Sequence, residues 1–588
     1  LSQEEITADT TLPAGNCYEV ANQITIKKDA TLTIGEGARL AFQDDAGLVV
    51  EGDGASLVAE GTEQKPITFT GAKEQPGYWK GIWFRDSESS NNALVHSVVE
   101  YAGESAFSYN DHAAAVTLGN PGGSAYIAKA KIENTTLRKS GGVGLVVGAD
   151  TSSAKRSELI SFKDNVIKEN QGPPVSVSVL NISSLDTGTT YTGNDTDVIE
   201  VFDGEDIDQD VTIPNYGIPY RVVNTIKVSG GQFTIAKGTQ LNFAQATGLE
   251  VDDPGSLRAV GSQGNRIVFD GTNSTRGHWK GIWLKDTKAS NNLIKYVTIK
   301  SAGASPWSQF NTESAGLTLG NAGSSAWLAN VQLEETKFVD SAGFGLLVGG
   351  DTNSKNHSKL VSFANNEFKT NKQGPILLPA AAVDSLDSGS TYTGNDNDRI
   401  VLEGNGLVGD AARIRDLGIP YVVEDTIEVK GTNGLLEVDP GVTMEFEQAV
   451  GLAVKDEAGL NLAGTGSKKI TLTGSRQVTG WWKGVYYKDT RHALNQLKHV
   501  TIEYGGGAAW DSRTEAANLT LQAYNNAKSS VSVESLTLSN SSRFGVFVEE
   551  YSSNYAFTVL SCSNVTTSGN ATAVGGDKSI WTSACGAP

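Results

Sequence analysis

The sequence predicts an all-β protein that coils as a parallel β-helix, and three observations support this fold class. Short segments with two apolar residues in alternation recur along the chain, and Gly, Asp, Asn or Pro separates them. Hairpin signals such as Asn-Gly are scarce, which argues against a sandwich or barrel. The 66 glycines and single methionine, beside many Ser, Thr and Asn, favour turns and strands over helices.

The apolar pairs occur in the same order three times. The pairs are Leu32/Ile34, Leu40/Phe42 and Leu48/Val50; Phe233/Ile235, Leu241/Phe243 and Leu249/Val251; and Leu436/Val438, Met444/Phe446 and Leu452/Val454. Each pair places two apolar side chains on one face of a strand and a polar residue on the other. We expect three such strands to form one coil of about 25 residues, and the coils to stack about 4.8 Å apart.

A longer repeat contains these coils. Residues 77–92 read "GYWKGIWFRDSESSNN", residues 277–292 read "GHWKGIWLKDTKASNN", and a looser copy starts at Gly480. The repeat length is therefore close to 200 residues. The sequence predicts three homologous β-helix units: 1–216 and 217–417, each ending in a connector, and 418–588, ending in a C-terminal cap.

The recurring motif is either a site or part of the scaffold. Trp79, Trp279 and Trp482 recur with Lys and Gly, and a feature that recurs with the fold is expected to serve the fold. The alternative is that these rings stack on carbohydrate. The residue before the tryptophan varies, as an exposed position would, so Tyr78, His278 and Trp481 are candidate ligand-binding residues.

No catalytic residue emerges from the aligned repeats. His96 aligns with Tyr296 and His499, and a general acid or base rarely tolerates such replacement. We find neither a histidine pair at zinc-ligand spacing nor a defensible Ser-His-Asp order.

The loop that follows the motif by about 30 residues differs in each repeat and carries aromatic residues beside polar ones. The candidate ligand-binding residues there are Phe107, Tyr109, Trp307, Phe310 and Trp510. Aromatic rings with polar edges suit a surface that binds sugars or proteins. The alternative is that these rings fold back and cover the flank of the β-helix.

Paired aspartates end the first two repeats. Asp195 and Asp197 lie in "GNDTD", and Asp396 and Asp398 lie in "GNDND". Carboxylates at alternate positions suit Ca²⁺, so calcium is the candidate cofactor, although the spacing is not that of an EF-hand loop. The alternative is an Asn/Asp turn that connects one repeat to the next.

Charge and cysteine usage indicate the compartment. The net charge of −20 argues against nucleic acid or anionic membrane as a partner, and no apolar run is long enough to span a membrane. The start of the chain lacks a secretory signal, which has been removed or was never present. Cys562 and Cys585 either form a disulfide, which implies an oxidising compartment, or are two buried thiols; Cys17 has no obvious partner.

The stretch "GARLAFQDDAGLVVEGDGASLVAEGTEQKPITFTG", with "GYWKGIWF" and "LVHSVVEYAG" after it, resembles the bacterial secreted proteins with right-handed parallel β-helix repeats, of the pectate-lyase-like fold group. The resemblance implies a right-handed β-helix in an extracytoplasmic location, secreted or at the cell surface. Its members range from polysaccharide lyases to adhesins. Because no catalytic pattern emerges and the variable loops carry aromatic residues beside polar ones, we expect a non-catalytic binding or adhesion protein for glycans or partner proteins. The alternatives are a polysaccharide lyase or glycoside hydrolase, and a structural spacer.

Overall fold

The computed structural model describes residues 4–108, 110–120, 126–148, 156–202, 206–311, 313–322, 327–350, 356–403, 407–408, 410–524, 529–551 and 556–586. It divides into two compact units, residues 1–250 with 254–273, and residues 251–253 with 274–588. All strand pairs described below are parallel. The predicted fold class, an all-β right-handed parallel β-helix, is confirmed, whereas the grouping into three units stays a prediction.

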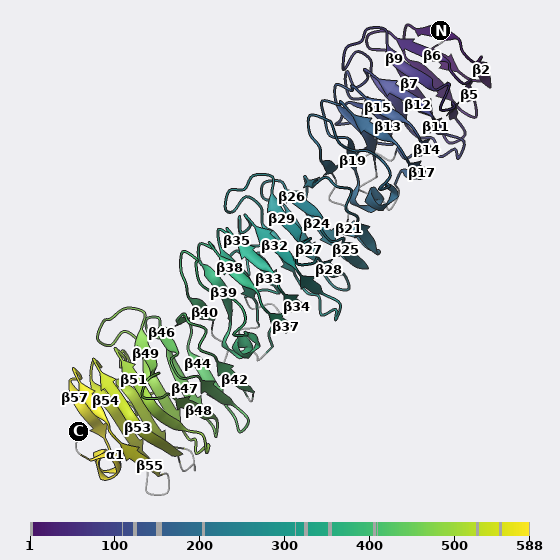
Figure 1. Cartoon of the computed structure of the whole chain (residues 1–588). Helices are drawn as coiled ribbons and strands as arrows, with labels where there is room; N and C mark the ends of the chain where they lie inside the picture. The colour runs from purple at the N-terminus through teal and green to yellow at the C-terminus, as the bar shows by residue number, and fades with distance from the viewer. Residues whose placement is uncertain are drawn as a thin grey trace. The chain divides into compact units, whose positions relative to one another are not determined.

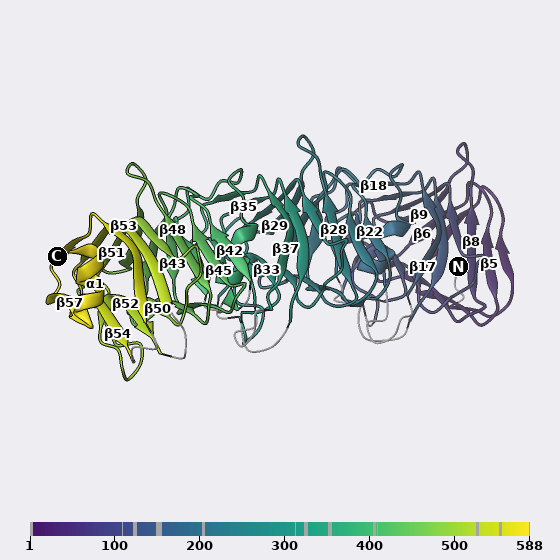
Figure 2. The same cartoon turned by 90° about the horizontal axis from the view of Figure 1, so that it is seen from below.

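Unit 1 is a stack of three-stranded coils (Figures 1 and 2). Its first sheet contains β1 (Glu5–Ile6), β4 (Ile24–Lys27), β7 (Gly47–Glu51), β10 (Gly81–Phe84), β13 (Ala114–Leu118), β16 (Val143–Val147), β19 (Val175–Val177), β20 (Ile199–Val201), β23 (Tyr220–Val222), β26 (Gln240–Phe243) and β29 (Ile267–Gly271). Its second contains β2 (Thr10–Leu12), β5 (Thr31–Ile34), β8 (Ser56–Glu60), β11 (Ala93–Val95), β14 (Lys129–Glu133) and β17 (Glu158–Lys163). Its third contains β3 (Cys17–Val20), β6 (Arg39–Phe42), β9 (Ile67–Gly71), β12 (Ser97–Glu100), β15 (Thr136–Arg138) and β18 (Val166–Lys168).

The second and third sheets end at β17 and β18, and a 3-10 helix, η1 (Val179–Ser184), follows β19. Two new ladders then begin. They contain β21 (Asp206–Ile207), β24 (Ile226–Val228) and β27 (Gly248–Val251), and β22 (Val211–Ile213), β25 (Gln232–Ile235) and β28 (Ser256–Val260). In the first repeat β6 belongs to the third sheet, whereas its counterpart in the second repeat, β26, belongs to the first sheet. The coil strands change sheets between repeats.

Unit 2 has the same construction. One ladder contains β30 (Gly281–Leu284), β33 (Ala315–Leu319), β36 (Phe344–Val348), β39 (Gly374–Pro379), β40 (Ile400–Glu403), β43 (Tyr421–Val423), β46 (Thr443–Phe446) and β49 (Ile470–Gly474). Two short ladders contain β31 (Leu293–Lys295), β34 (Asn330–Glu334) and β37 (Lys359–Ala364), and β32 (Val297–Lys300), β35 (Lys337–Val339) and β38 (Glu367–Lys369). The 3-10 helix η2 (Ala380–Ser385) follows β39.

The remaining strands of unit 2 form its C-terminal coils. One sheet contains β41 (Leu407–Val408), β44 (Ile427–Lys430), β47 (Gly451–Lys455), β50 (Gly484–Lys488), β52 (Ala517–Ala523), β54 (Phe544–Glu550) and β57 (Thr572–Gly576). The other strands belong to the same sheet as β30 and β49. They are β42 (Ala411–Ile414), β45 (Leu435–Val438), β48 (Gly459–Ala463), β51 (Gln496–Glu503), β53 (Ser529–Ser539), β55 (Phe557–Ser563) and β56 (Thr566–Ser568). The helix α1 (Lys578–Cys585) contacts β55 and β57 at the C-terminal end of this stack (Figure 1).

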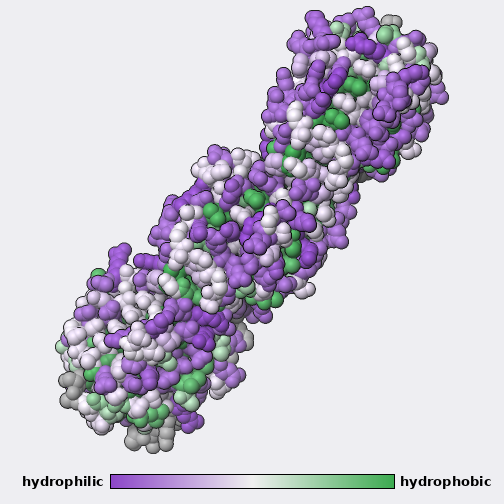
Figure 3. Space-filling model, in the orientation of Figure 1, coloured by the Kyte–Doolittle hydropathy of each residue, from purple (hydrophilic) through white to green (hydrophobic). Residues whose placement is uncertain are grey.

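The core consists of the apolar pairs that the sequence predicted. Leu32, Leu40, Phe42, Leu48 and Val50 are fully buried, because alternate side chains point into the coil. Hydrophilic residues predominate on the face shown in Figure 3, and hydrophobic residues form small separate patches there. Within the described residues, no helix is long and apolar enough to cross a membrane.

Candidate functional site

The tryptophans of the recurring motif belong to the scaffold. Trp79, Trp279 and Trp482 are fully buried. Trp79 stacks on Phe42 and Trp482 on Phe446, with ring centroids 4.0 and 4.1 Å apart. Each indole N–H donates to a main-chain carbonyl at 2.8–2.9 Å, on Glu100, Lys300 and Glu503 respectively. The rings are therefore unavailable for carbohydrate stacking, and the scaffold interpretation holds.

The glycine two residues later is required by a close backbone approach. Gly81, Gly281 and Gly484 have φ of 114°, 106° and 100°. A Cβ on Gly81 would lie 2.4 Å from the carbonyl oxygen of Ala114 on the next coil, and the other two glycines are equally confined. Both the positive φ and the contact exclude larger residues. The motif recurs because each repeat needs this packing.

Two residues after this glycine, each repeat carries an aromatic side chain on the outer face of its sheet. In unit 1 this residue is Trp83, and Phe107 stacks on it with centroids 5.2 Å apart. Tyr126 meets the same indole edge-on at 6.1 Å. The Arg85 guanidinium lies 4.5 Å from the Tyr126 ring and pairs with Glu51 at 3.0 Å. We call these five residues aromatic cluster 1.

Aromatic cluster 1 borders a cavity of about 270 Å³. Lys80 and Asp45, which form an ion pair at 2.6 Å, also line it. The cavity therefore presents an apolar wall together with hydrogen-bonding groups of both charges. Its lining residues are Gln23, Asp45, Val49, Glu51, Lys80, Trp83, Arg85, Ser105, Ala106, Phe107 and Ser108.

Unit 2 contains a second set, aromatic cluster 2, built on Trp283. Trp307 stacks on this indole at 5.6 Å, and Trp327 meets it edge-on at 5.8 Å. The Lys285 ammonium lies 4.8 Å from the Trp327 centroid and pairs with Asp252 at 2.7 Å. Cluster 2 consists of these five residues, and it repeats the arrangement of cluster 1 with lysine and aspartate in place of arginine and glutamate.

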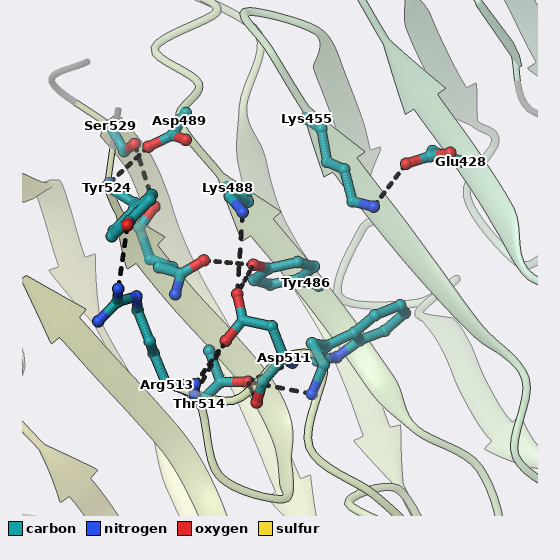
Figure 4. A network of polar contacts seen from close by, with 12 residues as sticks. Glu428, Lys455, Tyr486, Lys488, Asp489, Asp511, Arg513, Thr514, Tyr524 and Ser529 are labelled. Carbon is teal, nitrogen blue, oxygen red and sulfur yellow. Dashed lines mark hydrogen bonds and ion pairs between the residues drawn. The ribbon is translucent and has the colours of Figure 1, made fainter. Parts of the chain in front are cut away.

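Aromatic cluster 3 is built on Tyr486 of β50 in unit 2 (Figure 4). It consists of Tyr486, Lys488, Trp510, Asp511, Arg513 and Tyr524. Trp510 stacks on Tyr486 at 5.0 Å. The Tyr486 hydroxyl donates to Asp511 at 3.2 Å, and the Lys488 ammonium lies 3.8 Å from the same carboxylate. The Arg513 guanidinium lies 4.5 Å from the centroid of the Tyr524 ring, and it donates a hydrogen bond to the Tyr524 hydroxyl at 3.0 Å.

Two groups of cluster 3 have shifted pKa values. Burial raises the pKa of Tyr486 far above its usual range, and the neighbouring Asp511 adds to the effect. Burial alone would raise the pKa of Asp511, but the hydrogen bond from the Arg513 main-chain N–H, with the charge of Lys488, lowers it below its usual value. Tyr486 is therefore a neutral donor and Asp511 an anion near neutral pH.

The loop residues predicted from the sequence come together with strand residues that the sequence analysis missed. Phe107, Trp307 and Trp510 all stack on the strand aromatic, and Phe310 lies edge-on to Trp327 at 6.1 Å. Tyr109 lies outside the described residues. Trp83, Trp283 and Tyr486 could have been found, because each stands between two inward-pointing apolar residues and so must point outward.

The loop aromatics fold back onto the flank of the β-helix, which is the alternative that the sequence left open. Two of them also lie beside lysine ammonium groups. Phe107 is only 6% exposed, whereas Trp307 and Trp510 stay partly exposed. The Lys280 ammonium lies 5.2 Å from the Trp307 centroid, and that of Lys483 lies 5.4 Å from Trp510. These lysines belong to the recurring motif. The motif thus supplies a buried tryptophan for the scaffold and a cation for the cluster.

The residues that precede the motif tryptophan differ from expectation. Tyr78, predicted to be exposed, is buried, because its ring packs at the end of β9, where a Cβ on Gly71 would touch it. His278 is partly buried and its main-chain N–H donates to the carbonyl of Ser301. Trp481 is partly buried and donates to the Ser475 hydroxyl at 3.0 Å.

The paired aspartates lie in turns. The Asp197 carboxylate accepts from the N–H groups of Gly193 and Asn194 at 3.0 and 2.8 Å, and Asp398 accepts equivalent bonds from Gly394 and Asn395. Burial by itself would raise the pKa of Asp197, but these hydrogen bonds lower it below its usual value. They are the contacts of a connecting turn.

Of the other two aspartates, Asp396 pairs with Arg276 at 2.7 Å, and the main-chain N–H of Asp195 donates to the carbonyl of Asn170. Among the described residues, no three His, Cys, Asp or Glu side chains are grouped to hold a metal. Calcium binding here stays a hypothesis, which predicts a lower melting temperature in chelator.

The predicted disulfide is present. Cys562 on β55 is bonded to Cys585 at the end of α1. Trp581 of α1 is buried, so the helix covers the apolar end of the coil stack and the disulfide holds it there. Cys17 is an exposed free cysteine.

Comparison with known proteins agrees with this architecture. Residues 4–112 match a pectate-lyase-like beta helix domain. In this chain the beta helix match runs from β1 through β12, and it includes Trp83 and Phe107 of cluster 1. No curated protein matches the chain.

Two solved structures of the PL6 family alginate lyase AlyGC are similar to the chain. The mutant enzyme has 10% sequence identity and a TM-score of 0.17, and covers 96% of this chain and 100% of its own. The other structure of AlyGC has 11% identity and a TM-score of 0.16, with 97% and 100% coverage.

Proposed function

We propose that the protein is an extracytoplasmic, non-catalytic binding protein that recognises glycans through its three aromatic clusters. The observation that carries the proposal is recurrence. Each repeat places an outward aromatic strand residue, a loop aromatic and a flanking cation together, while the loop sequence changes. A catalytic centre needs one constellation, whereas a binding protein gains from several.

The chemistry of the clusters suits sugars. An indole or phenol face offers an apolar surface to the C–H face of a pyranose ring. The cations and carboxylates beside it, such as Arg85 with Glu51 and Lys285 with Asp252, offer donors and acceptors to hydroxyl groups. A mixed lining of this kind fixes the orientation of a ligand. The disulfide supports the extracytoplasmic location, because disulfides persist in oxidising compartments.

Clusters 2 and 3 lie on different sheets of unit 2. Cluster 2 is built on β30 and cluster 3 on β50, which belongs to the ladder from β41 to β57. One straight glycan groove along a single sheet is therefore not the binding mode that this unit favours. Two separate sites that each bind a different part of a glycan, or different glycans, fit the geometry. Linked weak sites raise the overall affinity without new contacts.

A glycan array tests the proposal. We expect Trp307→Ala and Trp510→Ala each to weaken binding of the array ligand about tenfold, and the double variant to weaken it further, because each removes a stacking surface of about 1–3 kcal/mol. Val361→Ser is the matched control, since Val361 is 61% exposed and lies outside the clusters. Unchanged binding by the double variant would refute the role of the clusters.

The same glycans test the alternative of a polysaccharide lyase or glycoside hydrolase. The observation in its favour is the cavity at cluster 1, where Arg85 and Lys80 lie beside Glu51 and Asp45. New reducing ends or unsaturated products that disappear in Arg85→Ala would establish that activity. Stable binding without products supports the binding protein.

A further inference from the structure

Unit 2 carries an aliphatic row on the outer face of a sheet. Leu347, Leu377, Val401 and Val422 occupy paired positions on β36, β39, β40 and β43. Their neighbours along each strand point into the coil, so this row faces outward. Together with Phe344 they form a buried apolar cluster on the outer side.

The scaffold does not require an apolar row at this place. The equivalent positions of unit 1 are Val146, Ser176, Glu200 and Arg221, which pair in the same way on β16, β19, β20 and β23. There the Glu200 carboxylate accepts a hydrogen bond from Arg221 Nε at 2.9 Å and another from the Ser176 hydroxyl at 3.0 Å. The same coils thus accept a polar network in one unit and an aliphatic row in the other.

A cavity of about 300 Å³ lies over Leu377, Val401 and Val422 of the aliphatic row, and three glutamates also line it. The cavity is lined by Glu313, Phe344, Gln373, Leu377, Asn397, Arg399, Val401, Val422, Glu424 and Glu447. We call it the acidic groove. Its one lining cation, Arg399, lies 3.5 Å from Glu445. Among the described residues, the buried Oε1 of Gln373 accepts no hydrogen bond.

The carboxylates at the acidic groove repel one another. Burial first, and then the charges of Glu424, Asp425 and Glu313, raise the pKa of the adjacent Glu403 to about 7. Burial, Glu313, Glu447 and Asp425 raise that of Glu424. A cation in the groove would relieve this repulsion.

We propose that the acidic groove binds a lysine side chain of a basic partner polypeptide, with its methylenes on the aliphatic row and its ammonium among Glu313, Glu424 and Glu447. The lysine side chain combines an apolar stem with a charged end, which is the combination that the floor and rim present. The lining carries more carboxylates than cations, which favours a cationic ligand over a neutral sugar. The volume is at the low end for ligand pockets, which suits one side chain.

The test uses a short capped peptide of alternating lysine and serine, titrated into the full chain by calorimetry. Two matched peptides replace lysine with norleucine, which keeps the stem, or with diaminopropionic acid, which keeps the charge on a short stem. We expect the lysine peptide to bind at least about tenfold more tightly than either. Equal affinity for the diaminopropionic peptide, or tighter binding of an amino-sugar oligomer, would overturn the proposal.

Variants locate the binding site. Glu424→Gln/Glu447→Gln should weaken lysine-peptide binding about tenfold or more, whereas Glu63→Gln/Glu158→Gln makes the same charge change at exposed positions of unit 1 and should leave it unchanged. Val401→Glu/Val422→Arg places the ion pair formed by Glu200 and Arg221 of unit 1 at the equivalent positions of the row. This variant should fold and should no longer bind the lysine peptide. Binding that survives both groove variants would refute the proposal.

Two further readouts separate this site from the aromatic clusters. Ammonium binding favours the ionised forms of Glu403 and Glu424, so the affinity should rise about tenfold from about pH 5 to about pH 8. The charged groups Asp425, Glu313, Glu445, Glu447 and Arg399 also face this region. Trp307→Ala and Trp510→Ala should leave lysine-peptide binding intact. Loss of glycan binding alone, or of peptide binding alone, therefore identifies which proposal fails.

Discussion

Trp482→Ala is expected to lower the stability of unit 2 by about 3–5 kcal/mol. The substitution removes a fully buried indole that stacks on Phe446 and donates to the carbonyl of Glu503. The rigid coils on either side cannot collapse into the space, so a cavity remains and the carbonyl loses its donor. Calorimetric melting of the full chain, in which the unit 2 transition shifts down, measures the loss.

Trp510→Ala is the matched comparison. Trp510 stacks on the outer side of the sheet and remains partly exposed, so its removal should cost only about 1 kcal/mol. Trp482→Ala should therefore impair folding, and Trp510→Ala should impair glycan binding. Equal loss of stability in the two variants would show that the loop ring belongs to the scaffold and would remove it from the proposed site.

Replacing both cysteines of the disulfide, Cys562→Ala/Cys585→Ala, is expected to destabilise unit 2 by about 3 kcal/mol. The bond closes a loop with a sequence separation of 23, and opening it returns that conformational freedom to the unfolded chain. Loss of the bond also loosens α1, whose Trp581 covers the end of the coils. Chemical denaturation with and without a reductant measures the effect.

Cys17→Ala is the control for this experiment, because Cys17 is exposed and unbonded. It should leave the denaturation midpoint unchanged. In the double cysteine variant a reductant should have no further effect. If the double variant melts like the natural protein, α1 is held by its apolar contacts alone and the disulfide contributes little.

Much of the fold follows from local sequence. The pairs Leu32/Ile34 and Leu40/Phe42 are buried as predicted, since a two-residue period leaves a strand one apolar face. The alignment of His96 with Tyr296 and His499 is equally informative. All three residues have a positive φ, of 43°, 52° and 48°, so the position serves a corner of the coil rather than a reaction.

The candidate sites were only half visible in the sequence. The loop aromatics Phe107, Trp307 and Trp510 stood out by composition, but their partners Trp83, Trp283 and Tyr486 appeared to be ordinary strand residues. Whether a loop ring points to solvent or packs on its own sheet depends on the path of the loop. Phe107 lies against Gly47 and Trp510 against Gly451, both on the preceding coil and about 60 residues earlier in the chain, so local sequence does not show the path.

The sequence by itself determined the strand pattern and the 200-residue repeat, because both depend on spacing along the chain. The scaffold role of the motif and the disulfide each stood beside an alternative, and the buried tryptophans and the bonded cysteines of the structure decided them. Only the tertiary structure decided which sheet each strand joins and which outward side chains become neighbours. The row Leu347, Leu377, Val401 and Val422 exists only because parallel coils bring these residues into register. Register between coils is a non-local property, and it creates both the aromatic clusters and the acidic groove.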